Sequence, residues 1–213
     1  MPPPAKRVNL PPLYVILDPE QTKARPATDI LRELLEGGVK LLQLRAKALA
    51  PRDFLQLARE TRALTRTYGC RLIANDRVDI ALACEADGVH LGQDDMPLHA
   101  ARRLMRERII GISTHDIEQA KHAERVGADY IGFGPMFGTR TKKTGYTARG
   151  LDMLRELRAT VKIPIVAIGG ITEANVNEVW EAGADSAAII TDILTADDVA
   201  EKVRRILALH QSL

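Results

Sequence analysis

The chain has 213 residues, of which 46% are hydrophobic and 27% are charged, and its formal net charge at neutral pH is +2. This length suits one domain with a sizeable core, and so small a net charge gives no indication of a nucleic-acid-binding surface. Because it has no membrane-length apolar run and no signal-peptide pattern, we expect a cytoplasmic protein without membrane contacts, with reduced cysteines and a flexible tail over residues 1–12.

Short apolar runs rich in Ile, Val and Leu alternate with amphipathic stretches along the chain. This alternation is typical of parallel strands that helices cover on both faces. The clearest helical stretches are Pro51–Tyr68, Ile117–Val126 and Leu151–Leu157. The strand-like runs are, in chain order, Leu13–Asp18, Leu41–Arg45, Arg71–Asn75, Gly88–Leu91, Ile109–Ser113, Tyr130–Gly134, Ile165–Ile168 and Ala187–Ile190.

Eight strands that alternate with helices predict an α/β fold, a single-domain (β/α)8 TIM barrel over residues 1–213. A doubly wound open sheet is the main alternative, because it has the same alternation of elements. A weak repeat favours the barrel, since a helix-ending turn with a small residue precedes each even-numbered strand. These turns are Glu36-Gly37-Gly38-Val39, Glu85-Ala86-Asp87-Gly88, Val126-Gly127-Ala128-Asp129 and Ala182-Gly183-Ala184-Asp185.

Ionisable and hydrogen-bonding side chains gather where the apolar runs end. In a barrel these ends surround one mouth, where such enzymes place their chemistry. Gln43 and Arg45 alternate along one strand, so their side chains face the same way. The other polar residues in these positions are Lys47, Asn75, Asp76, Gln93, Asp94, Asp95, Ser113, Thr114, His115, the run Thr139-Arg140-Thr141-Lys142-Lys143, Gly169, Gly170, Thr191 and Asp192.

Three loops have the composition of anion-binding sites. Gly169-Gly170-Ile171-Thr172 and Ile190-Thr191 follow the seventh and eighth runs, whose loops commonly bind phosphate in such barrels. The basic run Thr139–Lys143 offers hydroxyl and ammonium groups that suit phosphate or diphosphate. Each pattern also fits a simpler structure, a tight turn for the glycines and a solvated loop for the basic run.

Asp76 and Asp95 are the best candidate ligands for magnesium, which prefers a few carboxylates together with water and phosphate oxygens. Each could instead cap the helix that follows it. Their position on one rim, facing cationic side chains, favours joint ligation. His90, inside a strand, suits a hydrogen-bonded core histidine, and His115 suits a partly structural role, so neither is assigned as a general base.

At these residues the chain resembles the thiamine-phosphate synthase (thiamine-phosphate pyrophosphorylase) family, from Tyr14 to about Leu207. The resemblance implies a transferase that joins 4-amino-2-methyl-5-hydroxymethylpyrimidine diphosphate to 4-methyl-5-hydroxyethylthiazole phosphate, releasing diphosphate and thiamine phosphate. The matching motifs are Gln43-Leu44-Arg45-Ala46-Lys47, Asn75-Asp76, His90-Leu91-Gly92-Gln93-Asp94-Asp95, Ser113-Thr114-His115, Thr139-Arg140-Thr141-Lys142-Lys143 and Ile168-Gly169-Gly170-Ile171.

The resemblance also implies the role of each site residue. Mg²⁺ is the implied cofactor, bound by Asp76 and Asp95, and the implied catalytic residues are Arg45, Lys47, Ser113 and Lys142. Two departures from the family pattern are Thr191, where serine is usual, and Leu17, where many members have threonine. The implied residues for the pyrimidine diphosphate are Gln43, Leu44, Arg45, Ala46, Lys47, Asn75, Ser113 and Lys142, and those for the thiazole phosphate are Thr139, Arg140, Thr141, Gly170, Ile190 and Thr191.

The residues suit this chemistry, because a thiazole nitrogen that attacks with its own lone pair needs no general base. The cations would stabilise the departing diphosphate, and the pyrimidine amino group favours a dissociative path. The alternatives are a thiazole tautomerase of the same barrel family, a phosphosugar isomerase or epimerase, and a non-catalytic barrel that binds thiamine precursors. The candidate metal pair argues against the first and third, and the lack of an acid–base pair against the second. The oligomeric state is left open.

Overall fold

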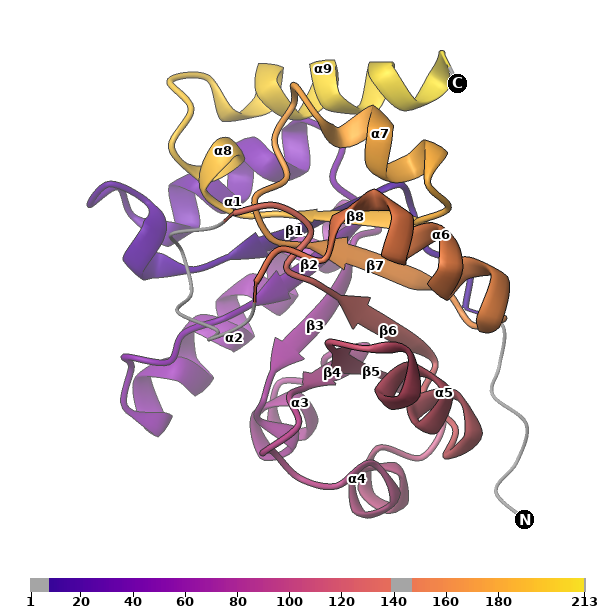
Figure 1. Cartoon of the computed structure of the whole chain (residues 1–213). Coiled ribbons are helices and arrows are strands. Elements are labelled where there is room, and N and C mark those ends of the chain that lie inside the picture. The colour runs from indigo at the N-terminus through magenta and orange to yellow at the C-terminus, as the bar shows by residue number, and fades with distance from the viewer. Residues whose placement is uncertain (1–7, 139–146, 213) are drawn as a thin grey trace.

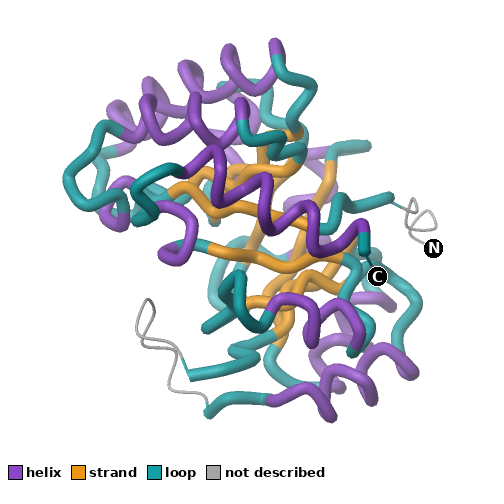
Figure 2. The backbone as a smooth tube through the Cα atoms, turned by 90° about the horizontal axis from the view of Figure 1, so that it is seen from above, coloured by secondary structure: helices purple, strands orange, loops and turns teal. Residues whose placement is uncertain are grey.

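The computed structural model describes residues 8–138 and 147–212. Each strand is hydrogen-bonded in parallel to the next, and β8 returns to β1, so the sheet is a closed barrel. The strands occupy the centre of the molecule and the helices lie around them (Figures 1 and 2). The closed order confirms the barrel and excludes the doubly wound sheet. The strands are β1 (Leu13–Leu17), β2 (Leu41–Leu44), β3 (Arg71–Asn75), β4 (Gly88–Leu91), β5 (Ile109–Thr114), β6 (Tyr130–Phe133), β7 (Ile165–Ile168) and β8 (Ser186–Ile189).

The helices that surround the barrel bury one apolar face each. The predicted helices over Pro51–Tyr68 and Ile117–Val126 are present and each ends one residue earlier, whereas the third extends beyond Leu157 to Thr160. The helical elements are η1 (Pro19–Gln21), α1 (Ala27–Glu36), α2 (Pro51–Thr67), α3 (Val78–Ala83), α4 (Leu98–Met105), α5 (Ile117–Arg125), α6 (Gly150–Thr160), α7 (Val176–Glu181), α8 (Thr191–Leu194) and α9 (Val199–Gln211).

Strand residues alternate between two apolar layers, because successive side chains of a strand point to opposite faces. In β1, Val15 and Leu17 belong to the large cluster beneath the helices, whereas Tyr14 and Ile16 belong to a smaller cluster inside the barrel. Leu10 joins the inner cluster and is 8% exposed. The inner layer therefore fills the barrel below its mouth.

Residues 8–12 pack against the barrel, although we expected them to belong to a flexible tail. Trp180 Nε1 donates a hydrogen bond to the Pro12 carbonyl at 3.0 Å, and the Arg71 guanidinium donates to the Asn9 carbonyl at 2.6 Å. Because Leu10 is also buried against the inner cluster, this segment forms part of the core. The expectation is therefore wrong for residues 8–12, and residues 1–7 lie outside the described part of the chain.

Two expectations from composition concern the cysteines and the membrane. Cys70 and Cys84 are free and buried, and burial raises the pKa of the Cys70 thiol to about 12, so it remains protonated at neutral pH. Among the described helices, none has both the length and the apolar composition needed to cross a bilayer.

In the helix-ending turns before β4, β6 and β8, an aspartate carboxylate makes the same two contacts: an ion pair with a helix arginine and a hydrogen bond from a strand N–H. Before β6, the Asp129 carboxylate accepts a hydrogen bond from Ile110 N at 2.7 Å and pairs with Arg102 of α4 at 2.6 Å. The same geometry recurs where Asp87 pairs with Arg62 and accepts from Leu72 N, and where Asp185 pairs with Arg158 and accepts from Ile165 N. Each carboxylate therefore ties a helix to the start of the preceding odd-numbered strand, which explains the aspartate that the repeat carries before β4, β6 and β8.

Replacing Asp129 with alanine is expected to lower the free energy of unfolding by about 3 kcal/mol, because it removes the carboxylate partner of Arg102 and the acceptor of a strand N–H in a mostly buried setting. Urea denaturation followed by circular dichroism measures the change. The control is Asp152→Ala, which removes a fully exposed carboxylate paired with Arg155 and should change the free energy of unfolding far less. Equal losses in the two variants would contradict a structural role for the contacts of Asp129.

Candidate active site

A cavity of about 450 Å³ lies at the C-terminal ends of the strands. Polar groups from β2 to β5 line one part of it, and the loops after β7 and β8 line another. The barrel thus brings together residues that are far apart in the sequence. The predicted site residues that line the cavity are Gln43, Arg45, Asn75, Ser113, Gly170, Ile190 and Thr191.

Besides Lys47, two predicted substrate-binding residues, Leu44 and Ala46, do not line the cavity. Both are buried in the layer between the strands and the helices, because they alternate with Gln43 and Arg45 along the strand and its extension. Their side chains anchor β2 to the helical layer. Leu17 lies in the same layer, so its departure from the family pattern does not alter the cavity wall.

Arg45 forms an ion pair with Asp18, which follows the end of β1. The Asp18 side chain is 1% exposed and also accepts a hydrogen bond from Glu20 N at 3.1 Å. A buried carboxylate fixes the position of the guanidinium at the cavity. The sequence analysis assigned no role to Asp18, although this ionisable residue ends the first apolar run.

Asp76 and Asp95 lie side by side, and Lys47 joins them. Lys47 Nζ is 2.7 Å from the Asp76 carboxylate, and Asp95 accepts a hydrogen bond from Gly92 N at 2.7 Å. Asp76 has a φ of +62°, and its N–H donates to the His90 carbonyl at 2.8 Å, which turns the chain at the rim. The two carboxylates and the ammonium group therefore form one charged cluster at the ends of β3 and β4.

The pKa values of Asp76 and Asp95 are shifted in opposite directions, because the two carboxylates lie close to each other and Lys47 pairs with only one of them. Burial opposes ionisation of Asp76, but the hydrogen bonds of Lys47 and Asp95 together with the charge of Lys47 outweigh burial and hold the Asp76 pKa below its ordinary value. Burial raises the pKa of Asp95, and the nearby Asp76 charge adds to that increase. Two carboxylates this close repel each other unless a proton or a cation lies between them, so the pair has the chemistry of a cation site.

A chain of hydrogen bonds crosses the barrel interior along the cavity, and all its members except Tyr130 line the cavity. Gln43 Nε2 donates to the Tyr14 hydroxyl at 2.9 Å, and the hydroxyls of Tyr14 and Tyr130 are 2.9 Å apart. His90 Nδ1 is 3.0 Å from the Tyr130 hydroxyl, and His90 Nε2 is 2.9 Å from Ser113 Oγ. The chain joins two predicted site residues, Gln43 and Ser113, and it gives His90 the hydrogen-bonded environment expected from the sequence.

Two glycines make room for this chain. A Cβ atom at Gly111 would lie 2.0 Å from Tyr130 Cζ, and one at Gly132 would lie 3.0 Å from His90 Cε1. Glycines inside strands mark such close approaches. Gly111 and Gly132 in β5 and β6 were therefore the available sequence signal for the close approach of the buried Tyr130 ring and the partly buried His90 ring.

The loops after β6 and β7, which both line the cavity, pack tightly against each other. Gly170 has a φ of +70°, and a Cβ atom there would lie 2.7 Å from the Gly138 carbonyl oxygen and 2.8 Å from Phe137 Cβ. Only glycine meets both requirements without strain. Thr191 opens the short helix α8 beside this loop. The predicted residues Thr139, Arg140, Thr141 and Lys142 lie outside the described residues.

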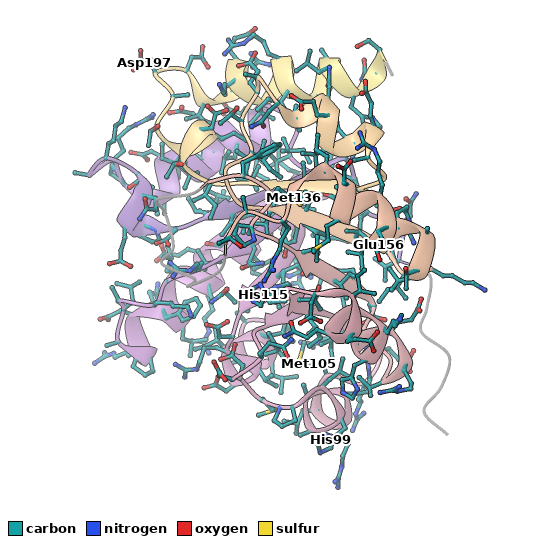
Figure 3. The ribbon with its side chains drawn as sticks, viewed as in Figure 1. His99, Met105, His115, Met136, Glu156 and Asp197 are labelled. Atoms are coloured by element: carbon teal, nitrogen blue, oxygen red, sulfur yellow. The ribbon has the colours of Figure 1, made fainter. Side chains whose placement is uncertain are left out.

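His115 lines the cavity but has a structural contact as well. Its Nδ1 donates to the Gly134 carbonyl at 2.8 Å, and its backbone N–H donates to Gln119 Oε1 at 2.9 Å. Figure 3 shows His115 within the barrel region, whereas His99 lies on the outer side of α4. The partly structural role expected for His115 agrees with these contacts.

A cluster of charges holds the loops after β7 and β8 against α9. Lys202 Nζ is 2.8 Å from Glu173 and 3.0 Å from Asp192, and Asp192 also accepts a hydrogen bond from Glu173 N at 2.9 Å. Hydrogen bonds from Arg205, followed by those from Lys202, lower the pKa of Glu173 from 4.5 to about 2. The cluster thus fixes the two glycine- and threonine-containing loops relative to each other.

Glu173→Gln is expected to lower the free energy of unfolding at neutral pH by about 1 kcal/mol, because these ion pairs are partly solvated. The folded-state pKa lies below the ordinary value, so this stabilisation is complete above pH 4.5 and is lost as the pH falls toward 2. The melting temperatures of the wild-type protein and of Glu173→Gln should therefore converge as the pH falls from about 4.5 to about 2. Glu178→Gln, at an exposed position of α7, is the control, and a pH-independent gap would contradict the assignment.

The model of a family described as thiamine monophosphate synthase matches residues 13–193. Thiamine-phosphate synthase of Chloroflexus aurantiacus is 46% identical over 197 residues, which cover 92% of this chain and 91% of that protein. Thiamine-phosphate synthase of Geobacillus kaustophilus is 48% identical over 188 residues, which cover 86% and 85%. Among solved structures, thiamine phosphate pyrophosphorylase from Pyrococcus furiosus has a TM-score of 0.87 at 39% identity, with 94% of this chain and 96% of that chain covered.

Proposed function

Since the chain belongs to the thiamine monophosphate synthase family, we propose that the cavity at the mouth of its barrel is where the synthase reaction takes place. The chain is accordingly a transferase that makes thiamine phosphate from small phosphorylated substrates. The observation that carries the assignment of the site is the convergence of Arg45, Ser113 and Gly170 on one cavity, with the Asp76–Asp95 pair following the neighbouring strands β3 and β4 outside the cavity lining.

The pyrimidine diphosphate lies, in this proposal, against β2 to β5. Gln43, Asn75 and Ser113 offer neutral hydrogen-bonding groups at the cavity, and Arg45 offers a cation whose position Asp18 fixes. Lys47 is paired with Asp76 at the rim, so it can contact a diphosphate oxygen without losing its carboxylate partner. Lys142, outside the described residues, is the remaining cation in this proposed set.

Magnesium is the proposed cofactor, and Asp76 and Asp95 would hold it. The fit rests on the hydrogen-bonded carboxylate pair, whose mutual repulsion a divalent cation would relieve. No group of three His, Cys, Asp or Glu side chains suited to a metal occurs among the described residues, so water and diphosphate oxygens would complete the coordination. Bound there, the ion would supply positive charge to the leaving diphosphate.

The thiazole phosphate lies, in this proposal, at the loops after β6, β7 and β8. Gly170 allows the backbone to approach an anion closely, and Ile190 and Thr191 bring the start of α8 to the same place. Thr191 retains the hydroxyl of the serine that is usual in the family. The basic segment Thr139–Thr141, which lies outside the described residues, would complete this subsite.

The reaction is proposed to be dissociative. The bond between the pyrimidine methylene carbon and the diphosphate oxygen breaks first, and the diphosphate keeps the electron pair. The thiazole nitrogen then donates its lone pair to the methylene carbon, and the positive charge ends on the thiazolium ring. Arg45, Lys47 and Lys142 stabilise the departing diphosphate, and the cavity aligns the two substrates. No step removes a proton, which agrees with the absence of a role for a general base.

The direct test is an assay for thiamine phosphate from the two purified precursors, with magnesium and with excess chelator. Product is expected only with magnesium, and magnesium-independent product formation would contradict the cofactor assignment. A pyrimidine substrate with a fluorinated methyl group tests the path, because fluorine destabilises the cation. A fluorinated substrate that reacts as fast as the normal one would rule out the dissociative path.

A further inference from the structure

We propose that the buried chain from Gln43 to Ser113 is a one-directional hydrogen-bond relay, in which His90 and Tyr130 are positioning residues that orient both ends for the pyrimidine diphosphate. The proposal rests on the proposed function for the identity of that ligand. None of the three interior members, Tyr14, Tyr130 and His90, was assigned to the site from the sequence. They act through Gln43 and Ser113.

The relay has two directions in which every hydroxyl hydrogen has an acceptor, because each hydroxyl has one hydrogen to donate and leaving that hydrogen unpaired in the barrel interior is costly. If Gln43 Nε2 donates to Tyr14, then Tyr14 donates to Tyr130, and Tyr130 donates to His90 Nδ1. His90 Nε2 then carries the imidazole proton and donates it to Ser113 Oγ. In the opposite direction every donor becomes an acceptor, and the imidazole proton lies on Nδ1.

Burial keeps water from replacing the hydrogen-bond partners of the two tyrosine hydroxyls in the relay. Tyr14 and Tyr130 are 1% and 0% exposed, so neither hydroxyl can exchange its partner for bulk water. Burial also raises the pKa of both tyrosines, which keeps each hydroxyl a donor as well as an acceptor at neutral pH. The His90 ring stacks on Tyr130 with ring centroids 5.5 Å apart and an interplanar angle of 28°, which limits its rotation.

The two directions present opposite groups to a ligand. Running from Gln43 to Ser113, the relay leaves the Gln43 carbonyl oxygen as an acceptor and the Ser113 hydroxyl hydrogen as a donor. A 4-aminopyrimidine diphosphate offers an amino donor at one end and anionic acceptors at the other, so this direction matches both ends. The reverse direction would direct an amide N–H toward the amino group and consume the Ser113 hydrogen within the protein.

In the ligand-free protein, the ring nitrogen of His90 that carries the proton shows in which direction the relay runs. We expect long-range proton–nitrogen NMR spectra of ¹⁵N-histidine-labelled protein to show that His90 carries its proton on Nε2 and none on Nδ1. The spectra are recorded at a pH above the ordinary histidine pKa. The chain has five histidines, and the signals lost in His90→Gln identify His90. Protonation of His90 on Nδ1 in the wild-type protein would overturn the proposal, whether or not that protein makes thiamine phosphate.

Two variants separate the relay from simple packing, because each removes one buried hydroxyl from the same cluster. Tyr130→Phe deprives His90 Nδ1 of its donor, so we expect a mixture of tautomers and a loss of about tenfold in kcat/KM for the pyrimidine diphosphate. Tyr14→Phe leaves the Tyr130 hydroxyl facing His90, so the Nε2 tautomer should persist. KM for the thiazole phosphate should not change in either variant. An unchanged His90 tautomer in Tyr130→Phe, or equal tautomer changes in both variants, would show that the cluster only packs the barrel.

Discussion

Replacing Asp76 with asparagine is expected to lower kcat/KM by about 10³-fold while the fold remains intact. Asparagine keeps the size of the side chain and tolerates the left-handed backbone conformation at this position, where φ is +62°. It removes the carboxylate charge that Lys47 holds ionised beside Asp95, and with it half of the proposed magnesium site. Steady-state assays at saturating and at limiting magnesium measure the loss.

The matched control for this prediction is Asp94→Asn. Asp94 is an exposed carboxylate next to Asp95 in the sequence, so its replacement changes the net charge equally. It should leave kcat/KM nearly unchanged. Similar activities in the two variants, with similar melting temperatures, would remove Asp76 from the catalytic machinery.

Replacing Arg45 with glutamine is expected to lower kcat/KM by about 10²-fold and the free energy of unfolding by about 3 kcal/mol. The activity falls because the cavity loses a fixed cation that faces the diphosphate. The stability falls because Asp18, 1% exposed, loses its ionic partner. Enzyme kinetics and urea denaturation measure the two effects on the same preparation.

The double variant Arg45→Gln/Asp18→Asn separates the two effects. Two neutral amides can hydrogen-bond where the ion pair was, so most of the stability should return. The activity should remain low, because the cation is still missing. Recovery of activity along with stability would mean that Arg45 acts only through the fold.

Most of the fold could be predicted from the sequence because buried parallel strands are short, apolar and regularly spaced. Three strands, such as β3 over Arg71–Asn75, have the predicted bounds. β1, β2 and β6 end one residue earlier than predicted, β5 ends one residue later, and β8 lies one residue nearer the N-terminus. The N-terminal segment was misjudged because proline-rich composition does not reveal that Leu10 packs under the barrel.

The candidate site was predictable where its residues are ionisable and follow strands. Periodicity alone could have excluded Leu44 and Ala46, since both alternate with cavity-lining residues. The hydrogen-bond relay could not be predicted from the sequence, because Tyr14 and Tyr130 lie inside apolar runs and have the pattern of core residues. Only the spatial neighbours of each tyrosine hydroxyl show its polar role.

Binding of a divalent ion by Asp76 and Asp95 together is the claim on which the proposed chemistry depends, and manganese binding measured by electron paramagnetic resonance tests it most directly. In the presence of inorganic diphosphate, the wild-type chain is expected to bind Mn²⁺ at a single tight site that magnesium competes for. Asp76→Asn and Asp95→Asn should each lose this site, whereas Asp94→Asn should retain it. Wild-type affinity for Mn²⁺ in both Asp76→Asn and Asp95→Asn would contradict the claim.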